Sequence, residues 1–427
     1  LARGRALGGR LESGARVRIG RDTRRSGPML EGAVAAGLAS AGAEARLLGV
    51  LPTPAVAELV AASDAAAGVV ISASHNPFPD NGIKVFGGDG FKLADEDEAA
   101  VEAALDAPGA RPEGAELGAV VHAPEGRERY VESLIRRRPA DLSGLSLVGD
   151  CANGAGVTTA PEVLERLGAR VTVIGAEPDG VNINVDCGST HLDALSRSVR
   201  DVGADLGLAL DGDGDRVLAV DAAGEVVDGD QILAICALHM HAAGQLAGDA
   251  VVTTTMTNLG FRRAMAAHGI EVRWTDVGDR YVLAEMRRGG YVLGGEQSGH
   301  LINLLHGPSG DGLAAGLQLL AALLDGGRPL AEAAAVVQRL PQRLVSVRVA
   351  RKGDLPGASA VWDAVRACEA ELGDDGRVVL RASGTEPLVR VMVEAPTDER
   401  CEFWCREIAD LAVRELGTVD QSTAREA

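Results

Sequence analysis

One pattern occurs three times along the 427-residue chain and limits the folds that it can adopt. In each copy an apolar helical run ends at a glycine, and a β-rich run follows at once. The three glycines are Gly42, Gly168 and Gly269. A glycine just past a helix can adopt a positive φ, which stops the helix and turns the chain toward the next strand. The repetition therefore predicts three related α/β domains, each with its own sheet.

The end of the chain has a different order of elements. Strands are expected at 344–349, 378–380 and 389–393, with helices at 361–372 and 399–416. Such a grouping is typical of a small α+β domain. Linkers are expected where charged, glycine or proline residues separate these regions. The predicted domains are 1–122, 123–228, 229–341 and 342–427.

The composition argues against two classes of partner. A net charge of −19 disfavours a nucleic-acid partner, because phosphate backbones attract basic surfaces. The longest apolar stretch, 313–324, is about half of a membrane span, so we expect a buried helix there and no membrane partner. The six cysteines form no Cys-x-x-Cys pair and are expected to be reduced thiols of a cytoplasmic protein. They are Cys151, Cys187, Cys236, Cys368, Cys401 and Cys405.

Three aspartates, Asp211, Asp213 and Asp215, alternate with glycines directly after a strand expected at 206–210. The glycines let the chain turn so that the carboxylates converge, and such hard oxygen ligands suit Mg²⁺. An EF-hand calcium loop would need Gly and Glu where this chain has Arg216 and Ala222. An acidic turn without a metal stays open, because Asp-Gly pairs are ordinary turn residues.

Ser74 follows an apolar run at 66–70 and lacks the Gly-x-Ser-x-Gly elbow of hydrolases. In an extended segment His75 would point away from Ser74 and would not be an obvious base for it. A phosphoserine explains the pattern better. A metal held by three carboxylates can bridge to the phosphate and polarise it. A turn serine before Asn76-Pro77 is the alternative.

Two further segments present polar side chains after expected strands. Glu296, Ser298 and His300 would share one side of an extended segment, which suits sugar hydroxyls. The segment 381–387 joins small residues to an arginine that can bind phosphate through two nitrogens. A polar loop without a ligand stays open for each. The expected phosphate-binding residues are Arg381, Ser383, Gly384, Thr385 and Arg390.

These four segments, in this order, resemble the α-D-phosphohexomutase superfamily. The resemblance runs from residues 19–27 to residues 390–394, which is nearly the whole chain. Within the superfamily, the segments Cys187-Gly188-Ser189-Thr190-His191 and 295–300 are similar to the branch that acts on glucosamine phosphates. Relatives that act on mannose or glucose phosphates often carry Met at the position of Gln297.

The resemblance implies a fold and a reaction. It implies three α/β domains of similar topology and a smaller C-terminal α+β domain around a central cleft. The reaction would interconvert glucosamine 6-phosphate and glucosamine 1-phosphate through a bound 1,6-bisphosphate. The resemblance also implies a covalent phosphate on Ser74, one Mg²⁺ held by that residue and the three aspartates, and Glu296 and Ser298 on sugar hydroxyls. Residues implied as catalytic or cleft-lining are His75, Lys84, Arg216 and His300.

One part of the family pattern is not found. Relatives open with a Phe-Gly-Thr-Asp-Gly-x-Arg-Gly segment, and this sequence starts at Leu1 without it. We therefore expect a missing start that leaves the chain folded but slow. The alternatives to a glucosamine-phosphate mutase are a phosphomannomutase or phosphoglucomutase of the same superfamily, or a weakened sugar-phosphate-binding protein. The expected oligomeric state is a monomer or a homodimer.

Overall fold

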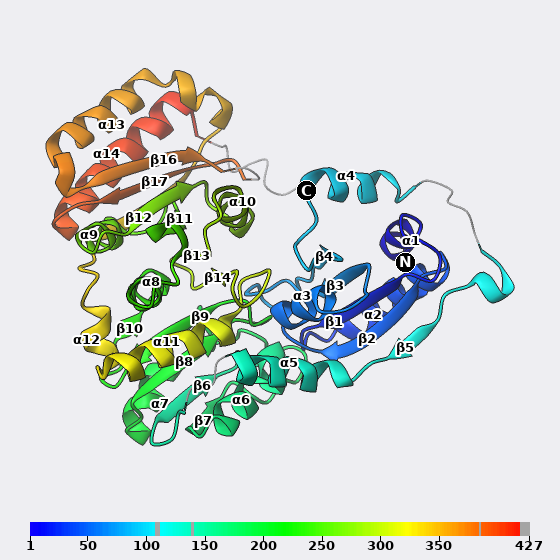
Figure 1. Ribbon diagram of the computed structural model, residues 1–427. Helices are drawn as coiled ribbons and strands as arrows, with labels where there is room; N and C mark the ends of the chain where they lie inside the picture. Colours follow the sequence, from blue (N-terminus) through cyan, green and yellow to red (C-terminus); the bar gives the residue numbers. More distant parts are fainter. Residues whose placement is uncertain (107–111, 138–140, 384–385, 419–427) are drawn as a thin grey trace. The chain divides into compact units, whose positions relative to one another are not determined.

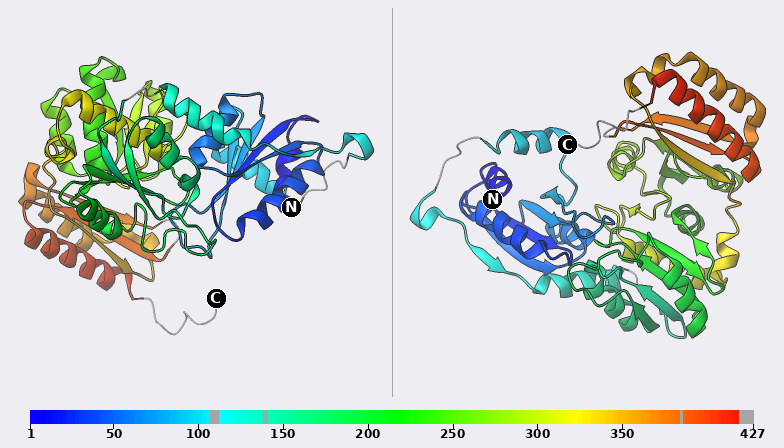
Figure 2. Two further views of the ribbon diagram at one scale, coloured as in Figure 1. Left: turned by 90° about the horizontal axis from the view of Figure 1, so that it is seen from below. Right: turned by 180° about the vertical axis from the view of Figure 1, so that it is seen from behind.

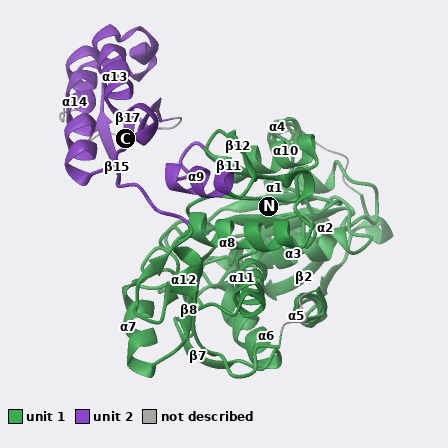
Figure 3. Ribbon diagram, turned by 60° about the vertical axis from the view of Figure 1, so that its left-hand side comes forward, with its two compact units in different colours: residues 1–254, 268–336 green, residues 255–267, 337–427 purple. Residues whose placement is uncertain are grey.

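The computed structural model describes residues 1–106, 112–137, 141–383 and 386–418 (Figure 1). Its strands form four sheets, within residues 16–122, 146–227, 250–303 and 342–394. The domain boundaries between them stay a prediction. The chain divides into two compact units, one of residues 1–254 and 268–336 and one of residues 255–267 and 337–427 (Figure 3).

The first sheet has the strand order β4-β3-β1-β2-β5. Helix α2 (Gly27–Ala39) packs against the sheet face that carries Val17 and Ile19. Helix α3 (Thr53–Ala61) covers the opposite face, where the absence of a side chain at Gly20 lets Val56 approach the strand. Helices α1 (Ala2–Gly8) and α4 (Asp95–Ala103) contact each other. The strands are β1 (Arg16–Arg21), β2 (Glu44–Val50), β3 (Ala67–Ile71), β4 (Ile83–Gly87) and β5 (Val120–His122).

The second sheet has the order β10-β9-β8-β6-β7. Figure 2 draws its residues, 146–227, in teal to green. Helix α7 (Asp193–Val202) packs Leu195 and Val199 against Val148 and Ala209. Its strands are β6 (Ser146–Asp150), β7 (Arg170–Ile174), β8 (Leu206–Leu210), β9 (Val217–Asp221) and β10 (Val226–Val227). The other helical segments here are α5 (Glu125–Arg137), η2 (Ala155–Thr158) and α6 (Ala160–Arg166).

The third sheet has the order β12-β11-β13-β14. Val282 and Met286 of helix α10 (Asp279–Gly289) pack against Val252 and Ile302. Strand β13 begins only at Leu293, because the Tyr291 amide still donates to the Met286 carbonyl in a bond that closes α10. The strands are β11 (Ala250–Thr254), β12 (Glu271–Thr275), β13 (Leu293–Gly295) and β14 (Leu301–Asn303). The accompanying helices are α8 (Gly229–Ala242), α11 (Gly312–Gly326) and α12 (Leu330–Ala334).

The three sheets share a four-strand core. In each, the order across the sheet is fourth, third, first and second strand, and only the fourth runs antiparallel to its neighbour. Before each second strand lies one of the predicted helices, α2, α6 or α9 (Leu259–Ala267). Gly42, Gly168 and Gly269 all have positive φ, as expected from the sequence. The prediction of three related α/β domains is therefore confirmed.

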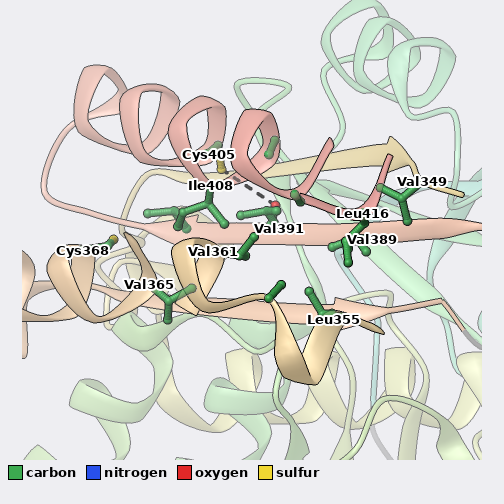
Figure 4. Close-up of a cluster of buried hydrophobic side chains, with 14 of the residues drawn as sticks. Val349, Leu355, Val361, Val365, Cys368, Val389, Val391, Cys405, Ile408 and Leu416 are labelled. Atoms are coloured by element: carbon green, nitrogen blue, oxygen red, sulfur yellow. Dashed lines mark hydrogen bonds between the residues drawn. The ribbon is translucent and has the colours of Figure 1, made fainter. Parts of the chain in front are cut away.

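The fourth sheet lies in the second compact unit and is fully antiparallel, with the order β15-β17-β16. Its strands are β15 (Gln342–Arg348), β16 (Arg377–Ala382) and β17 (Leu388–Glu394). Helices α13 (Ser359–Leu372) and α14 (Asp398–Leu416) bury Val361, Val365 and Ile408 against Val389 and Val391 (Figure 4). This arrangement confirms the predicted α+β domain.

Helix α11 is the buried apolar helix expected at 313–324. Among the described residues, no helix is both long and apolar enough to cross a membrane. All six cysteines are buried free thiols. The apolar character of α11 therefore serves packing inside the first unit.

Replacing Leu317 by Ala tests the contribution of α11 to the core. The side chain is fully buried, so its truncation should lower the free energy of unfolding by about 2–5 kcal/mol, through lost apolar burial and a residual cavity. Leu324→Ala on the same helix is the control, since Leu324 is 40% exposed. Denaturant unfolding of both variants gives the comparison, and equal losses would contradict this view of the core.

Candidate active site

Three of the four sequence motifs occupy one topological position. The serine loop (72–82), the metal loop (211–216) and the sugar loop (296–300) each join the third strand of a sheet to its antiparallel fourth strand. The phosphate loop (383–387) likewise joins the antiparallel strands β16 and β17. The carboxyl ends of the third strands therefore present the candidate chemistry in all three α/β domains.

Ser74 lies beside the metal loop. Its Oγ donates a hydrogen bond of 2.6 Å to Oδ2 of Asp211. The His75 Nδ1 lies 3.4 Å from the same Oγ, so the prediction that His75 points away from Ser74 is wrong. The reason is that Ser74 has a φ of 49° and is not extended, which brings both side chains to one side. The side chain of Ser74 is half-buried and His75 is exposed.

The three aspartates form one buried cluster. Each offers a carboxylate oxygen, and these oxygens lie within 4.8 Å of one another. Gly214 makes the turn with a φ of 73°, and at Gly212 a side chain would collide with the Ser74 carbonyl oxygen, 2.6 Å away. The two glycines are therefore what allows the carboxylates to converge against the serine loop.

The cluster fits a divalent cation. Asp213 Oδ1 is buried and accepts no hydrogen bond from the described part of the chain. Burial, together with Asp215 and Asp213, raises the pKa of Asp211 well above its usual range. Burial also disfavours ionisation of Asp215, but Lys84 and His300 outweigh it and hold the pKa of Asp215 well below its usual range. A bound cation would relieve the repulsion that raises the pKa of Asp211.

Two cations border the cluster. Lys84 on β4 donates to Asp213 Oδ2 at 2.7 Å and to Asp215 Oδ2 at 3.4 Å. Burial opposes its charge, but these carboxylates raise the pKa of Lys84 above its usual value. The Arg216 guanidinium lies 3.9 Å from Asp215, and the Arg216 backbone amide donates to Asp211.

Burial and the nearby Arg216 lower the pKa of His75. The structure therefore brings Ser74, His75, Lys84 and Arg216 together with the triad.

The sugar loop is a hairpin turn, so the extended arrangement expected for Glu296, Ser298 and His300 is wrong. The Gly299 amide donates to the Glu296 carbonyl, and Gly299 has a φ of 89°. Ser298 is exposed and Glu296 is half-buried, where burial raises its pKa. His300 is buried instead, with Nδ1 3.5 Å from Asp215 and Nε2 3.7 Å from Asp279. Burial disfavours its charge, but Asp215 outweighs that effect, and the pKa of His300 is raised.

The side chain of Gln297 points away from this group. Its Nε2 donates to Oδ2 of Asp228 at 3.4 Å, and its carbonyl accepts from the Gly229 amide at 3.0 Å. Asp228 caps helix α8. Gln297 therefore anchors the sugar loop to the start of helix α8.

A cavity of about 610 Å³ opens beside His300. Its lining includes Thr53, Lys92, Asp215 and Asp279. A volume of this size is in the range of small-molecule sites. The cavity therefore has room for a small molecule next to the buried carboxylates.

In the second compact unit, Arg381 and Arg390 lie opposite each other on β16 and β17. Ser383 is buried, and its Oγ accepts a 3.4 Å hydrogen bond from the Glu386 amide. Lys352 donates to the carbonyl oxygens of Ser383 and Glu386 at 2.9 and 3.0 Å. Gly384 and Thr385 lie outside the described residues. The strands on either side of the phosphate loop thus carry two arginines, and a lysine contacts the loop.

Sequence reasoning missed three residues near these loops. Thr53 donates from its backbone to the Asp213 carbonyl at 2.9 Å and from Oγ1 to Asp213 Oδ2. Asp279 pairs with both Lys92 and His300, and Lys352 holds the phosphate loop. Thr53 and Asp279 lie in segments that resemble the superfamily, but only the fold shows their contacts.

Thr53→Val should weaken Mg²⁺ binding. The variant keeps the shape of the side chain but removes the hydroxyl that orients Asp213, and a hydrogen bond to a charged group contributes about 1.5–3 kcal/mol. We expect roughly tenfold weaker binding by isothermal titration calorimetry. Thr172→Val on the exposed side of β7 is the control. Unchanged Mg²⁺ affinity in Thr53→Val would show that the contact does not orient the ligand.

Models of four protein domains match the chain. They describe the α/β/α domains I, II and III of phosphoglucomutase/phosphomannomutase, at residues 1–111, 128–224 and 228–340, and the C-terminal domain, at residues 344–411. A solved phosphoglucomutase/phosphomannomutase family protein from Burkholderia thailandensis has a TM-score of 0.81 and 25% identity, covering 97% of this chain and 93% of its own. The N-acetylphosphoglucosamine mutase of Aspergillus fumigatus, solved with GlcNAc-6P and magnesium, shares the fold at a TM-score of 0.67 and 22% identity, covering 86% of this chain and 92% of its own.

Curated relatives are more similar. The phosphoglucosamine mutase of Saccharopolyspora erythraea is 55% identical over 411 residues, covering 96% of this chain and 93% of the relative. That of Mycolicibacterium paratuberculosis is 51% identical over 415 residues, covering 96% and 94%. With these relatives and all four domains matched, the chain belongs to the phosphoglucosamine mutases of the α-D-phosphohexomutase superfamily, which are isomerase-class phosphotransferases.

Proposed function

We propose that the chain interconverts glucosamine 6-phosphate and glucosamine 1-phosphate through phosphorylated Ser74. The observation that carries this proposal is the 2.6 Å contact between Ser74 Oγ and Asp211 within a buried cluster of three carboxylates. The product would supply UDP-N-acetylglucosamine for cell-wall precursors. Relatives that are 51–55% identical favour the glucosamine branch over phosphomannomutase or phosphoglucomutase activity.

Two phosphoryl transfers would take place in a turnover. In the first transfer the bond from phosphorus to Ser74 Oγ breaks, and a bond forms to the free hydroxyl oxygen of the sugar phosphate, which gives its proton to a base in the site. The resulting 1,6-bisphosphate turns over in the site. The bond between the other phosphorus and its sugar oxygen then breaks, that phosphoryl group forms a bond to Ser74 Oγ, and the freed sugar oxygen takes up the proton.

We assign Asp211, Asp213 and Asp215 to hold one Mg²⁺ together with phosphorylated Ser74. The cation would offset phosphate charge and polarise phosphorus. Lys84 and Arg216 would add positive charge at the same place. His75 and His300 would complete the catalytic residues, His75 beside the Ser74 oxygen and His300 between Asp215 and Asp279.

Substrate binding would use two loops. We assign Glu296 and Ser298 to the sugar hydroxyls. The non-reacting phosphate would bind the residues of the phosphate loop and its neighbouring strands, namely Arg381, Ser383, Gly384, Thr385 and Arg390. A second phosphate site is needed because the 1,6-bisphosphate has two phosphates. In either orientation of the sugar, one of them lies at Ser74 and the other lies at a distance from it.

We further propose a cytoplasmic enzyme that acts as a monomer or a homodimer and has no nucleic-acid or membrane partner. The net charge of −19 supports the absence of nucleic acid. The six free cysteines support a reducing compartment.

Ser74→Ala should abolish turnover and leave the chain folded, because a half-buried loop hydroxyl contributes little to stability but carries the phosphate. Intact-mass measurement should find one phosphate on the parent chain and none on the variant. Phosphate on another residue of the parent would overturn the assignment. Rates on glucosamine, glucose and mannose phosphates then test the branch, and faster turnover of mannose phosphate would favour the rival activity.

Arg381→Lys should raise the KM for both glucosamine phosphates about tenfold or more. A lysine presents a point charge and cannot reproduce the two parallel hydrogen bonds of a guanidinium to phosphate. Ser74 should remain phosphorylated in this variant. Arg400→Lys on the exposed side of α14 is the control. If KM stays unchanged for both substrates, Arg381 does not bind the substrate phosphate.

A further inference from the structure

Ser74 holds a backbone conformation that a residue with a side chain adopts only when its surroundings impose it. Its φ of 49° lies in the left-handed region, which is unfavourable for a non-glycine residue. The same conformation directs Oγ toward Asp211. Some other part of the fold must therefore stabilise this turn.

Four hydrogen bonds surround the backbone of the turn. Arg24 Nη2 donates to the carbonyl oxygens of Ser74 at 3.1 Å and of Asn76 at 2.6 Å. Asn184 Nδ2 donates to the same two oxygens, at 2.9 and 3.1 Å. Each NH₂ group has two protons and each carbonyl oxygen has two lone pairs, so the set is complete. We name these two donors and two acceptors the carbonyl clamp.

Arg24 is placed to hold the backbone and not the phosphate. It is fully buried, and its other terminal nitrogen, Nη1, donates to Asp22 and to Ser72 Oγ. Asp22 is also fully buried and neutralises the guanidinium. Ser72 Oγ in turn accepts the Ser74 amide at 3.0 Å. Both terminal nitrogens of Arg24 therefore donate hydrogen bonds to residues of the serine loop or to Asp22.

Asn184 reaches the turn from the second α/β domain. It is buried, has a φ of 60°, and donates from its backbone to the Ala152 carbonyl at 2.9 Å. Gly212 of the metal loop lies against the same place, since a side chain there would come within 2.6 Å of the Ser74 carbonyl and 2.8 Å of Asn184 Nδ2. The serine loop, the metal loop and Asn184 thus meet at one carbonyl oxygen.

We propose that Arg24 and Asn184 are positioning residues of the phosphoryl transfer, and that Asn184 sets the serine loop in register with the metal loop. This inference rests on the proposed function. In each turnover one phosphoryl group must leave Ser74 and another must be transferred to it, so Oγ must occupy the same place in both states. A clamp on backbone carbonyls does this without contacting the phosphate, and small displacements of a reacting group can cost about a hundredfold in rate.

Asn184→Ala and Asn184→Asp separate the hydrogen bonds from the volume of the side chain. Ala removes both donors and leaves space. Asp keeps the shape but presents oxygens that repel the two carbonyls. Val185→Ala is the control, since Val185 is the adjacent residue and is 52% exposed. The purified full chain is used throughout, with Mg²⁺ and glucosamine 6-phosphate.

We expect kcat to fall about 10- to 100-fold in Asn184→Ala and further in Asn184→Asp, with the KM for glucosamine 6-phosphate within twofold of the parent. Hydrogen exchange in a peptide spanning residues 72–76 should become faster in both variants, while the melting temperature stays close to that of the parent. Val185→Ala should match the parent in kcat, KM, hydrogen exchange and melting temperature.

Several results would overturn the inference. One is parent-like exchange at 72–76 in Asn184→Ala. A second is a full rescue of kcat by Asn184→Asp, which would show that only the volume matters. A third is a loss of kcat accompanied by an equal rise in KM and a general loss of exchange protection, which would indicate a structural role alone. Failure of the proposed function is distinguishable, because the parent chain would then carry no phosphate on Ser74.

Discussion

The concentration of negative charge at the metal loop is the constraint on which the rest of the first unit depends. Three carboxylates lie within 4.8 Å of one another and are buried, where their repulsion is weakly screened. Lys84 from the first sheet and His300 from the third both approach Asp215, and the metal loop belongs to the second sheet. Each α/β domain therefore contributes a charged or titratable group to the metal loop and its surroundings. Folding of the first unit brings these groups together.

The shared topology explains how three domains reach the same place. In each sheet the functional loop follows the third strand and precedes the antiparallel fourth. The repeated fold thus places a loop at the same position in three sheets. The side chains of these loops differ: one offers a hydroxyl, one a set of carboxylates, and one a carboxylate and an imidazole. Glycines at 212 and 214 permit the close approach in the metal loop, and Gly310 leaves room for the His300 ring, whose atoms would lie 2.3–2.7 Å from a side chain there.

Backbone geometry decided several points that residue spacing could not. Alternation along an extended chain predicted that His75 points away from Ser74 and that Glu296, Ser298 and His300 share a side. Both expectations failed because the segments are turns, with positive φ at Ser74 and Gly299. The period-two rule holds for strands, and it stops at the residue where the strand ends. The functional loops lie just beyond that point, so strand alternation does not predict the direction of their side chains.

The sequence by itself determined the class of fold, the order of the four motifs and the chemistry each motif offers. Those features depend on local periodicity, on glycines that end helices, and on residue types such as the three aspartates, all of which can be read along one segment. Only the tertiary structure decided that Thr53 holds Asp213, that Asp279 faces His300, and that Asn184 reaches the Ser74 carbonyl. These partners lie 160, 21 and 110 residues apart or belong to different sheets, and no local pattern links them, because side-chain contacts at such separations depend on how the sheets pack.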